Sequence, residues 1–166
     1  MASTVPLPQT PPSVSAQDQK FMDQAASSDL FEIQSSQLAL QRSRNPRTRS
    51  YAQHIIDDHT MASQRLAQLA QANGITLPTG LDPEQQRALA AIQNTRRIFD
   101  SEYFRQQALA HQAAIRTYET EANSGYNNDV KLFAQQTLPT LQEHLQIAEA
   151  GRQMPMGRIP AHSTVP

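Results

Sequence analysis

Four side chains of metal-ligating type fall on the apolar stripes of four different helical segments. They are Glu32, His59, His111 and His144. Three imidazoles and one carboxylate are the ligand set of a mononuclear centre, which suits zinc, iron, manganese or copper. Cysteine is absent from the chain, so thiolate centres and disulfides are excluded. The residue types therefore predict a site for one transition-metal ion.

The spacing of these residues predicts that they lie at one level of the fold. Glu32 and His59 each lie about 13 residues from a turn at 45–46, which is roughly 20 Å along a helix. His111 and His144 lie about 15 and 17 residues from a second turn, or roughly 22–26 Å. Burying such groups unpaired is costly, so a bound ion or a closed hydrogen-bond network must satisfy them.

A metal-free network of Glu and His hydrogen bonds is the alternative to a metal site, and a different phase of the helices is another. Asp58, next to His59, and Asp100, on the same face as His111, are candidates to accept hydrogen bonds from ring N–H groups. Asp100 lies two to three turns from His111, so capping or packing is its other interpretation. The polar residues expected to be solvent exposed are His54, Glu119 and Glu121.

The pattern argues against a di-iron centre of the ferritin type, because that centre needs Glu-x-x-His on two helices. The residues three positions before the inward histidines are Ile56, Ala108 and Leu141. A haem held by two histidines stays open, although Glu32 would be an awkward neighbour for it. The sequence shows no phosphate-binding loop, nucleophile elbow or zinc-protease motif, so enzyme activity has no positive support.

The elements that must position these side chains are helices, because apolar residues recur at helical spacing through the middle of the chain. The predicted helices cover residues 18–44, 46–72, 82–94, 96–123 and 129–150. Short turns at 45–46 and 124–128 make two antiparallel hairpins, and a longer connection joins them. The sequence predicts an all-α, antiparallel four-helix bundle with a short crossover helix between its second and third long helices.

Proline marks the ends of the predicted domain, which covers residues 17–151. Residues 1–16 and 152–166 are Pro-rich and are predicted to be disordered tails. The 14 basic and 15 acidic residues nearly cancel, which argues against a nucleic-acid partner. We expect no transmembrane segment and see no signal peptide, which leaves a cytoplasmic protein or an exported one whose leader is absent.

An ordered set of segments runs through the predicted domain: 21–26, 32–40, 51–60, 73–78, 99–103 and 137–141, together with His111 and His144. This set resembles the domain of unknown function 4142 family of bacterial proteins. The resemblance implies a ferritin-like helical bundle and export to the periplasm or cell envelope, and it brings no established reaction. One departure is that Ser27, Ser28 and Asp29 stand where the family often has a Gly-rich stretch.

Three hypotheses for function follow. The first is an exported bundle that holds one transition-metal ion through three histidines and one glutamate. The second is a structural or interaction module of the cell envelope in which a metal-free Glu and His network fixes the register of the helices. The third is oxidase chemistry at an open coordination position. The sequence predicts no particular protein partner for any of them.

Overall fold

The computed structural model describes residues 13–153, and every regular element among them is a helix. The helices are α1 (Ala16–Arg42), α2 (Pro46–Ala72), α3 (Pro83–Asn94), α4 (Phe99–Ser124) and α5 (Asn128–Arg152). The all-α prediction is confirmed for this part of the chain. The predicted tails lie outside the described residues, apart from 13–16 and 152–153.

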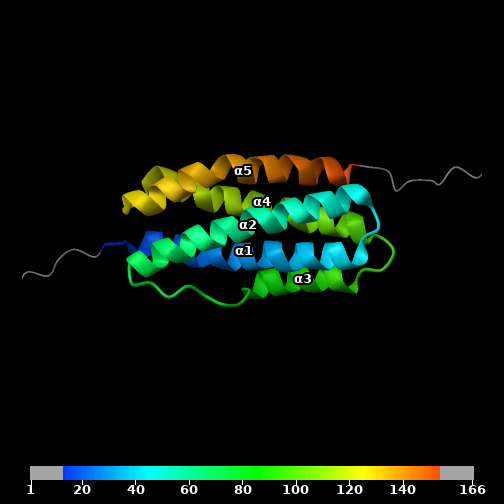
Figure 1. The fold of residues 1–166 in the computed structure, drawn as a ribbon, viewed down its shortest axis with the longest axis horizontal. Coiled ribbons are helices and arrows are strands. Elements are labelled where there is room, and N and C mark those ends of the chain that lie inside the picture. Colours follow the sequence, from blue (N-terminus) through cyan, green and yellow to red (C-terminus); the bar gives the residue numbers. More distant parts are fainter. Residues whose placement is uncertain (1–12, 154–166) are drawn as a thin grey trace, which may run out of the picture.

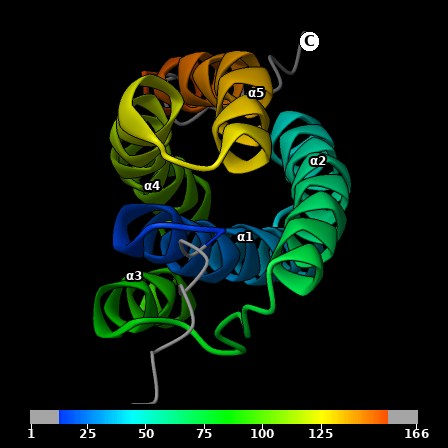
Figure 2. The same cartoon turned by 90° about the vertical axis from the view of Figure 1, so that its left-hand side faces the viewer.

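Four long helices lie side by side, with α1 antiparallel to α2 and α4 antiparallel to α5 (Figure 1). The shorter α3 lies outside these four, where it packs against α1 and α4 (Figure 2). Residues 95–98 separate α3 from α4, so the two are distinct helices. None of the helices in residues 13–153 combines the length and apolar content that crossing a membrane requires.

Local sequence signals explain where the helices begin. Ser15 and Asp18 form a capping box at the start of α1, and Asp82 forms another with Gln85 at the start of α3. The Asn45 side chain caps α2, whose first residue is a proline. After α2, Gly74 adopts a positive φ of 67°, which glycine tolerates without steric cost.

Two apolar clusters fill the interior, one toward each end of the long helices. The first cluster includes Phe21, Leu66, Tyr118 and Phe133, and the second includes Phe31, Ile55, Tyr103 and Phe104. On every long helix a buried polar residue lies between its contributions to the two clusters. We call the set formed by Asp29, Glu32, His59, His111 and His144 the polar layer.

The buried position of Glu121 corrects the expectation that this residue is solvent exposed. Its side chain is buried near the end of α4, where Gln17 of α1 donates a hydrogen bond to it over 3.2 Å. The neighbouring Asp18 is also buried and accepts from the backbone N–H groups of Tyr126 and Asn127. Glu121 lies at the edge of the apolar stripe of α4. The start of α1 and the α4–α5 turn cover it and exclude it from solvent.

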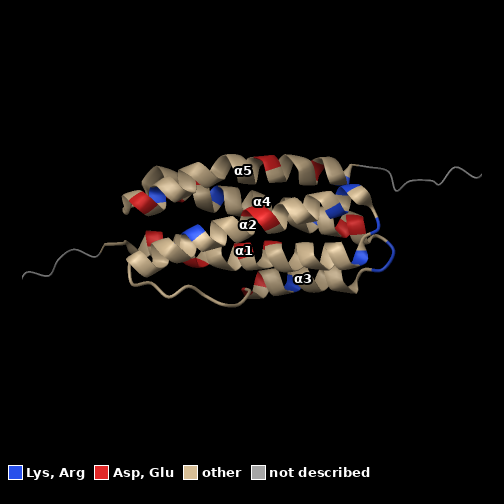
Figure 3. Ribbon diagram, viewed as in Figure 1, with Lys and Arg blue, Asp and Glu red and all other residues tan. Residues whose placement is uncertain are grey.

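Charged residues of both signs are scattered among uncharged ones along the long helices in the view of Figure 3. This interspersed pattern agrees with the near balance of 14 basic and 15 acidic residues. Large fields of one sign are what attract polyanions such as nucleic acids. The interior of the bundle, where the polar layer interrupts the apolar core, is therefore the stronger candidate for a functional site.

Candidate metal centre

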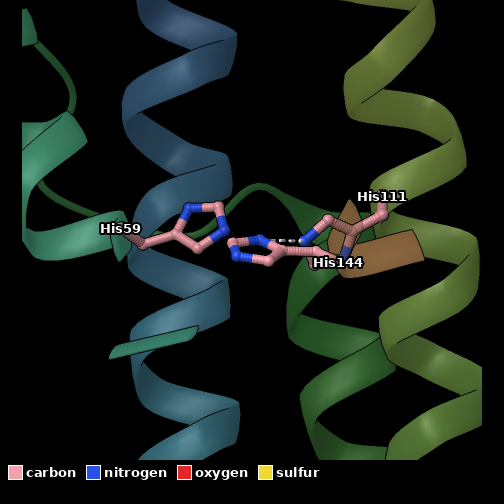
Figure 4. A group of neighbouring side chains, drawn as sticks. All are labelled: His59, His111 and His144. Carbon is pink, nitrogen blue, oxygen red and sulfur yellow. Dashed lines mark hydrogen bonds between the residues drawn. The ribbon is translucent and has the colours of Figure 1, made fainter. Parts of the chain in front are cut away.

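Three histidine rings from three helices meet in the polar layer. His59 comes from α2, His111 from α4 and His144 from α5, and at most 4% of any of the three is exposed. The rings point toward one another (Figure 4), and their centroids are 5.2–5.6 Å apart. One nitrogen from each ring lies within 4.8 Å of a nitrogen of both others. The structure thus brings together the three histidines that the apolar stripes directed inward.

The outer nitrogen of His111 is fixed by its own helix. Its Nδ1 lies 2.9 Å from the backbone carbonyl oxygen of Gln107, one turn earlier in α4. A carbonyl only accepts, so Nδ1 carries the hydrogen and donates it. In the neutral ring, Nε2 then holds a lone pair and no hydrogen, and this nitrogen faces His144 at 3.2 Å.

The orientation of His144 is fixed by a carboxylate from a neighbouring helix. Its Nε2 lies 2.9 Å from Oδ2 of Asp58 in α2, so Nε2 donates to the carboxylate. The lone pair of the neutral ring is therefore on Nδ1, which is the atom that faces His111. Asp58 thus occupies the orienting position that the sequence predicted, although it acts on His144 and not on the adjacent His59.

The same arrangement recurs at His59. Its Nδ1 lies 2.7 Å from Oδ1 of Asp29 in α1, and the Ser63 hydroxyl donates to the other carboxylate oxygen over 3.0 Å. Within residues 13–153, the buried Nε2 of His59 has no hydrogen-bond partner. All three rings therefore use one nitrogen to donate to a fixed acceptor and direct the other nitrogen into the cluster.

When His111 and His144 are both neutral, the contacts of this pair lack one proton or other positive charge. The chain of contacts from Gln107 through His111 and His144 to Asp58 has three links. Each link needs one hydrogen, and two neutral imidazoles bring only two. Exchanging the tautomer of His144 moves the mismatch to Asp58 and does not remove it. The deficit can be met by a third proton or by a cation that both lone pairs bind.

The electrostatics of the layer disfavour the third proton. Burial, together with the nearby His59 and His144 rings, holds the pKa of His111 well below its usual value. Burial and His59 lower the pKa of His144 to about 4, despite the opposing effect of Asp58. Burial would also lower the pKa of His59, but the hydrogen bond and charge of Asp29 raise it above its usual value. His111 and His144 are therefore neutral near pH 7.

Glu32 lies in the same layer but on another side of His111. Its Oε1 is 3.5 Å from Nδ1 of His111, the nitrogen that points away from the cluster. Both carboxylate oxygens are buried and have no hydrogen-bond partner among the described residues. Burial raises the pKa of Glu32 to about 7, against the opposing effect of His59. The structure thus groups the three histidines together and places Glu32 beside them.

Two aspartates differ from the sequence-based expectations. Asp100 lies at the start of α4, where it accepts a hydrogen bond from Ser43 just after α1. It is 11 residues from His111, or roughly 16 Å along the helix, so its contact secures the end of the bundle. Asp29 was not singled out, although it precedes Glu32 by three residues and therefore shares a helix face with it.

Comparison with family models identifies the chain, since the model for a domain of unknown function, DUF4142, matches residues 3–150. The chain belongs to the DUF4142 family. The resemblance seen in the sequence segments is confirmed. Comparison of this DUF4142 member with the curated proteins gives no match.

Solved structures similar to this DUF4142 protein share its helical fold. A DUF305 fragment from Deinococcus radiodurans matches with a TM-score of 0.74 and 16% identity, covering 82% of this chain and 95% of the other. CopM in a Cu(II)-bound form matches with a TM-score of 0.69 and 19% identity, covering 82% and 95%. CopM in an Ag-bound form gives 0.68 and 19%, covering 84% and 98%. At these identities the likeness describes the fold.

Proposed function

We propose that this protein binds one transition-metal ion in its polar layer, through Nε2 of His59, Nε2 of His111 and Nδ1 of His144. The observation that carries the proposal is the pair of lone-pair nitrogens that face each other at 3.2 Å between His111 and His144. Two nitrogens that each lie about 2.0–2.1 Å from a tetrahedral ion are about 3.3 Å apart. The two rings are therefore spaced as ligands of one ion are.

The groups behind the rings support a metal ion as the missing positive charge. Ligating histidines usually donate their second N–H to a carboxylate or a backbone carbonyl, which fixes the ring and makes it a stronger ligand. Here Asp29, Asp58 and the carbonyl of Gln107 take those three hydrogen bonds. All three rings thus have the kind of acceptor behind them that supports a ligating histidine.

Glu32 is the proposed fourth ligand, and to reach the ion its carboxylate has to turn from the Nδ1 side of His111 toward the three inward nitrogens. It is fully buried, and its carboxylate oxygens have no hydrogen-bond partner in residues 13–153. An ion at the three histidines would compensate the carboxylate charge and lower its pKa. Imidazole and carboxylate ligands suit copper, zinc, iron and manganese. The Cu(II)- and Ag-bound CopM structures make copper the first ion to test.

Metal analysis of the purified protein tests this proposal. After incubation with Cu(II) or Zn(II) and extensive dialysis, the wild type should retain one ion per chain, and His111→Ala, which lacks a core ligand, should lose its ion during the dialysis. Glu121→Gln, which changes a buried polar group outside the polar layer, is the matched control and should bind like the wild type. A wild type that takes up none of copper, zinc, iron and manganese would overturn the proposal.

That negative result would favour a metal-free structural module. In that case, replacing His59 and Glu32 together by leucine should leave the free energy of unfolding unchanged or raise it, because buried polar networks are often replaceable by apolar side chains. If the polar layer binds a metal ion, the same double variant should lose the stabilisation that the ion gives to the wild type. We propose no reaction for the site.

We also propose that the long helices form a ferritin-like bundle with α3 as the crossover helix, and that the protein acts in the periplasm or cell envelope. The location rests on the resemblance to exported members of the family, and the cytoplasm is the alternative. Fractionation of cells that express the natural gene, followed by detection with an antibody, tests it. Recovery of the protein with cytoplasmic markers would contradict export.

A further inference from the structure

A second set of ligands lies next to the core cluster, on the outer side of α2 and α5. It consists of His54, Asp58 and His144, each with one ligand atom within 4.8 Å of the others. His54 and Asp58 are four residues apart in α2, so they share a helix face, and Nε2 of His54 lies 3.4 Å from Oδ2 of Asp58. The rings of His54 and His144 are 5.3 Å apart at their centroids.

These three residues form a graded path from solvent to the interior. The exposed fractions of the side chains fall from 48% for His54 to 23% for Asp58 and 0% for His144. A surface hollow of about 490 Å³, lined by residues of α2, α4 and α5, has His54 in its wall. An ion that approaches along this face of α2 therefore meets His54 and Asp58 before it meets His144.

We propose that His54, Asp58 and His144 form an outer capture position for a divalent ion such as Cu(II), from which the ion passes to the core. The inference rests on the proposed function. Its structural basis is that His144 belongs to both sets and offers a different nitrogen to each. Nε2 faces Asp58 at 2.9 Å, and Nδ1 faces His111 at 3.2 Å.

The protons balance in both states of His144. An ion bound at Nε2 displaces the proton that Nε2 donates to Asp58, and Nδ1 takes up a proton and donates it to Nε2 of His111. When the ion moves to the core, Nδ1 loses that proton and Nε2 again donates to Asp58. One neutral imidazole serves one ion at a time, so the two positions exclude each other and the chain holds one ion.

A neighbouring pair of side chains provides a matched control. Gln53 and Asp57 have the same spacing in α2 as His54 and Asp58, and the Gln53 side chain donates to Asp57 over 2.9 Å on the exposed surface. This pair is not part of either ligand set. A variant at Gln53 therefore perturbs the same surface of α2 without changing the proposed capture position.

The rate of loading tests the capture position. Metal-free full-length protein is mixed rapidly with Cu(II) salt, the ligand-field absorption is followed, and the final copper content is measured after dialysis. We expect His54→Ala to load at least about tenfold more slowly than the wild type, because acidic and ligating groups at an opening raise the on-rate of ions. Its final content should still be one ion per chain, and Gln53→Ala should load like the wild type.

A second pair of variants tests the same position at equilibrium. His111→Ala removes a ligand of the core alone, so this variant should still bind Cu(II) weakly at the outer position. The double variant His54→Ala/His111→Ala should lose this residual binding, and Gln53→Ala/His111→Ala should keep it. Circular dichroism of each variant shows whether the helices are intact.

The outcomes separate this inference from the proposed function. Equal loading rates in His54→Ala and the wild type, with one ion in each, would overturn the capture position and leave the core site in place. Residual binding that survives in His54→Ala/His111→Ala would overturn it too. A wild type that binds no Cu(II) in either experiment would overturn both proposals together.

Discussion

Two buried polar groups in this bundle each contain a glutamate whose pKa is raised to about 7, yet the side chains and backbone around the two glutamates differ. One is the polar layer around Glu32, and the other is the pair of Asp18 and Glu121 near the start of α1. Both glutamates are at most 1% exposed. The difference lies in what the neighbouring groups offer, hydrogen-bond donors in one case and lone pairs in the other.

At the end of the bundle the chain supplies donors. Asp18 accepts hydrogen bonds from the backbone N–H groups of Ser15, Tyr126 and Asn127. Burial alone would raise the pKa of Asp18, but these hydrogen bonds lower it below its usual value. Burial and the nearby Asp18 carboxylate raise the pKa of Glu121. One carboxylate is charged and well paired, and the other is neutral near pH 6. This pair ties the start of α1 to the α4–α5 turn.

In the polar layer the donors face outward, and the lone pairs of the neutral His111 and His144 rings face inward. Each histidine donates to a fixed acceptor and directs its second nitrogen toward the other two rings. No backbone N–H group within the described residues donates to Glu32 or to these inward nitrogens. Burial and a shifted pKa therefore do not by themselves mark a binding site. The direction of the donors does.

The largest effect should come from removing a core ligand. In His59→Ala the affinity for Cu(II) should fall by more than about 100-fold, beyond the usual effect of losing an orienting residue. Isothermal titration of the metal-free protein measures the affinity. Asp18→Asn, at the other polar group, should keep wild-type affinity. If both variants bind Cu(II) as the wild type does, the two groups do not differ as we describe.

A smaller effect is expected for the residue that orients His59. Asp29→Asn keeps the size of the side chain but removes the charge that holds Nδ1, so the affinity for Cu(II) should fall by about 10–100-fold. Competition with a chromophoric chelator measures this change. Ser63→Ala removes the hydroxyl that holds Asp29 and should have a smaller effect of the same sign. Unchanged affinity in Asp29→Asn would mean that this hydrogen bond does not support metal binding.

A change in the pair of Asp18 and Glu121 should instead affect the stability of the fold and leave the affinity for metal unchanged. Asp18→Asn should lower the free energy of unfolding by about 1–2 kcal/mol, because it weakens charge-assisted hydrogen bonds from three backbone donors. Urea denaturation of the metal-free protein measures this loss. Glu102→Gln, which removes an exposed ion pair with Arg105, is the control and should cost less than about 1 kcal/mol. Equal losses in the two variants would contradict the structural role of Asp18.

The last prediction concerns the pH dependence of stability. The pKa of Glu121 is about 7 in the folded protein against a usual value of 4.5, so between these values the folded state holds a proton that the unfolded state releases. The contribution of Glu121 to the free energy of unfolding is therefore present at low pH and is lost as the pH rises toward 7. Glu121→Gln should abolish this contribution, as seen in the difference in unfolding free energy between wild type and variant at pH 5 and pH 7.5. A difference that does not change with pH would show that Glu121 is charged in the folded state.

Much of the fold follows from local signals in the sequence. Pro46 and Pro83 follow their capping residues, and both helices begin where the sequence predicts. The apolar stripes correctly directed His59, His111 and His144 inward, since helical spacing fixes which residues share a face. The apolar stripe of α4 wrongly predicted that Glu121 is exposed. The residue that covers Glu121 is Gln17, which lies 104 positions earlier in the chain.

The sequence by itself determined the helices and the inward faces that bring three histidines to one level. For His59 and His144, the packing of the helices decides which nitrogen is available there, whereas the backbone of α4 itself fixes this choice for His111. That choice depends on Asp29 for His59 and on Asp58 for His144, and each aspartate lies on a different helix from its histidine. An imidazole has two nitrogens, and the spacing of residues along the chain cannot distinguish them. Helix packing places an acceptor beside one nitrogen, and the second nitrogen is then free to act as the ligand.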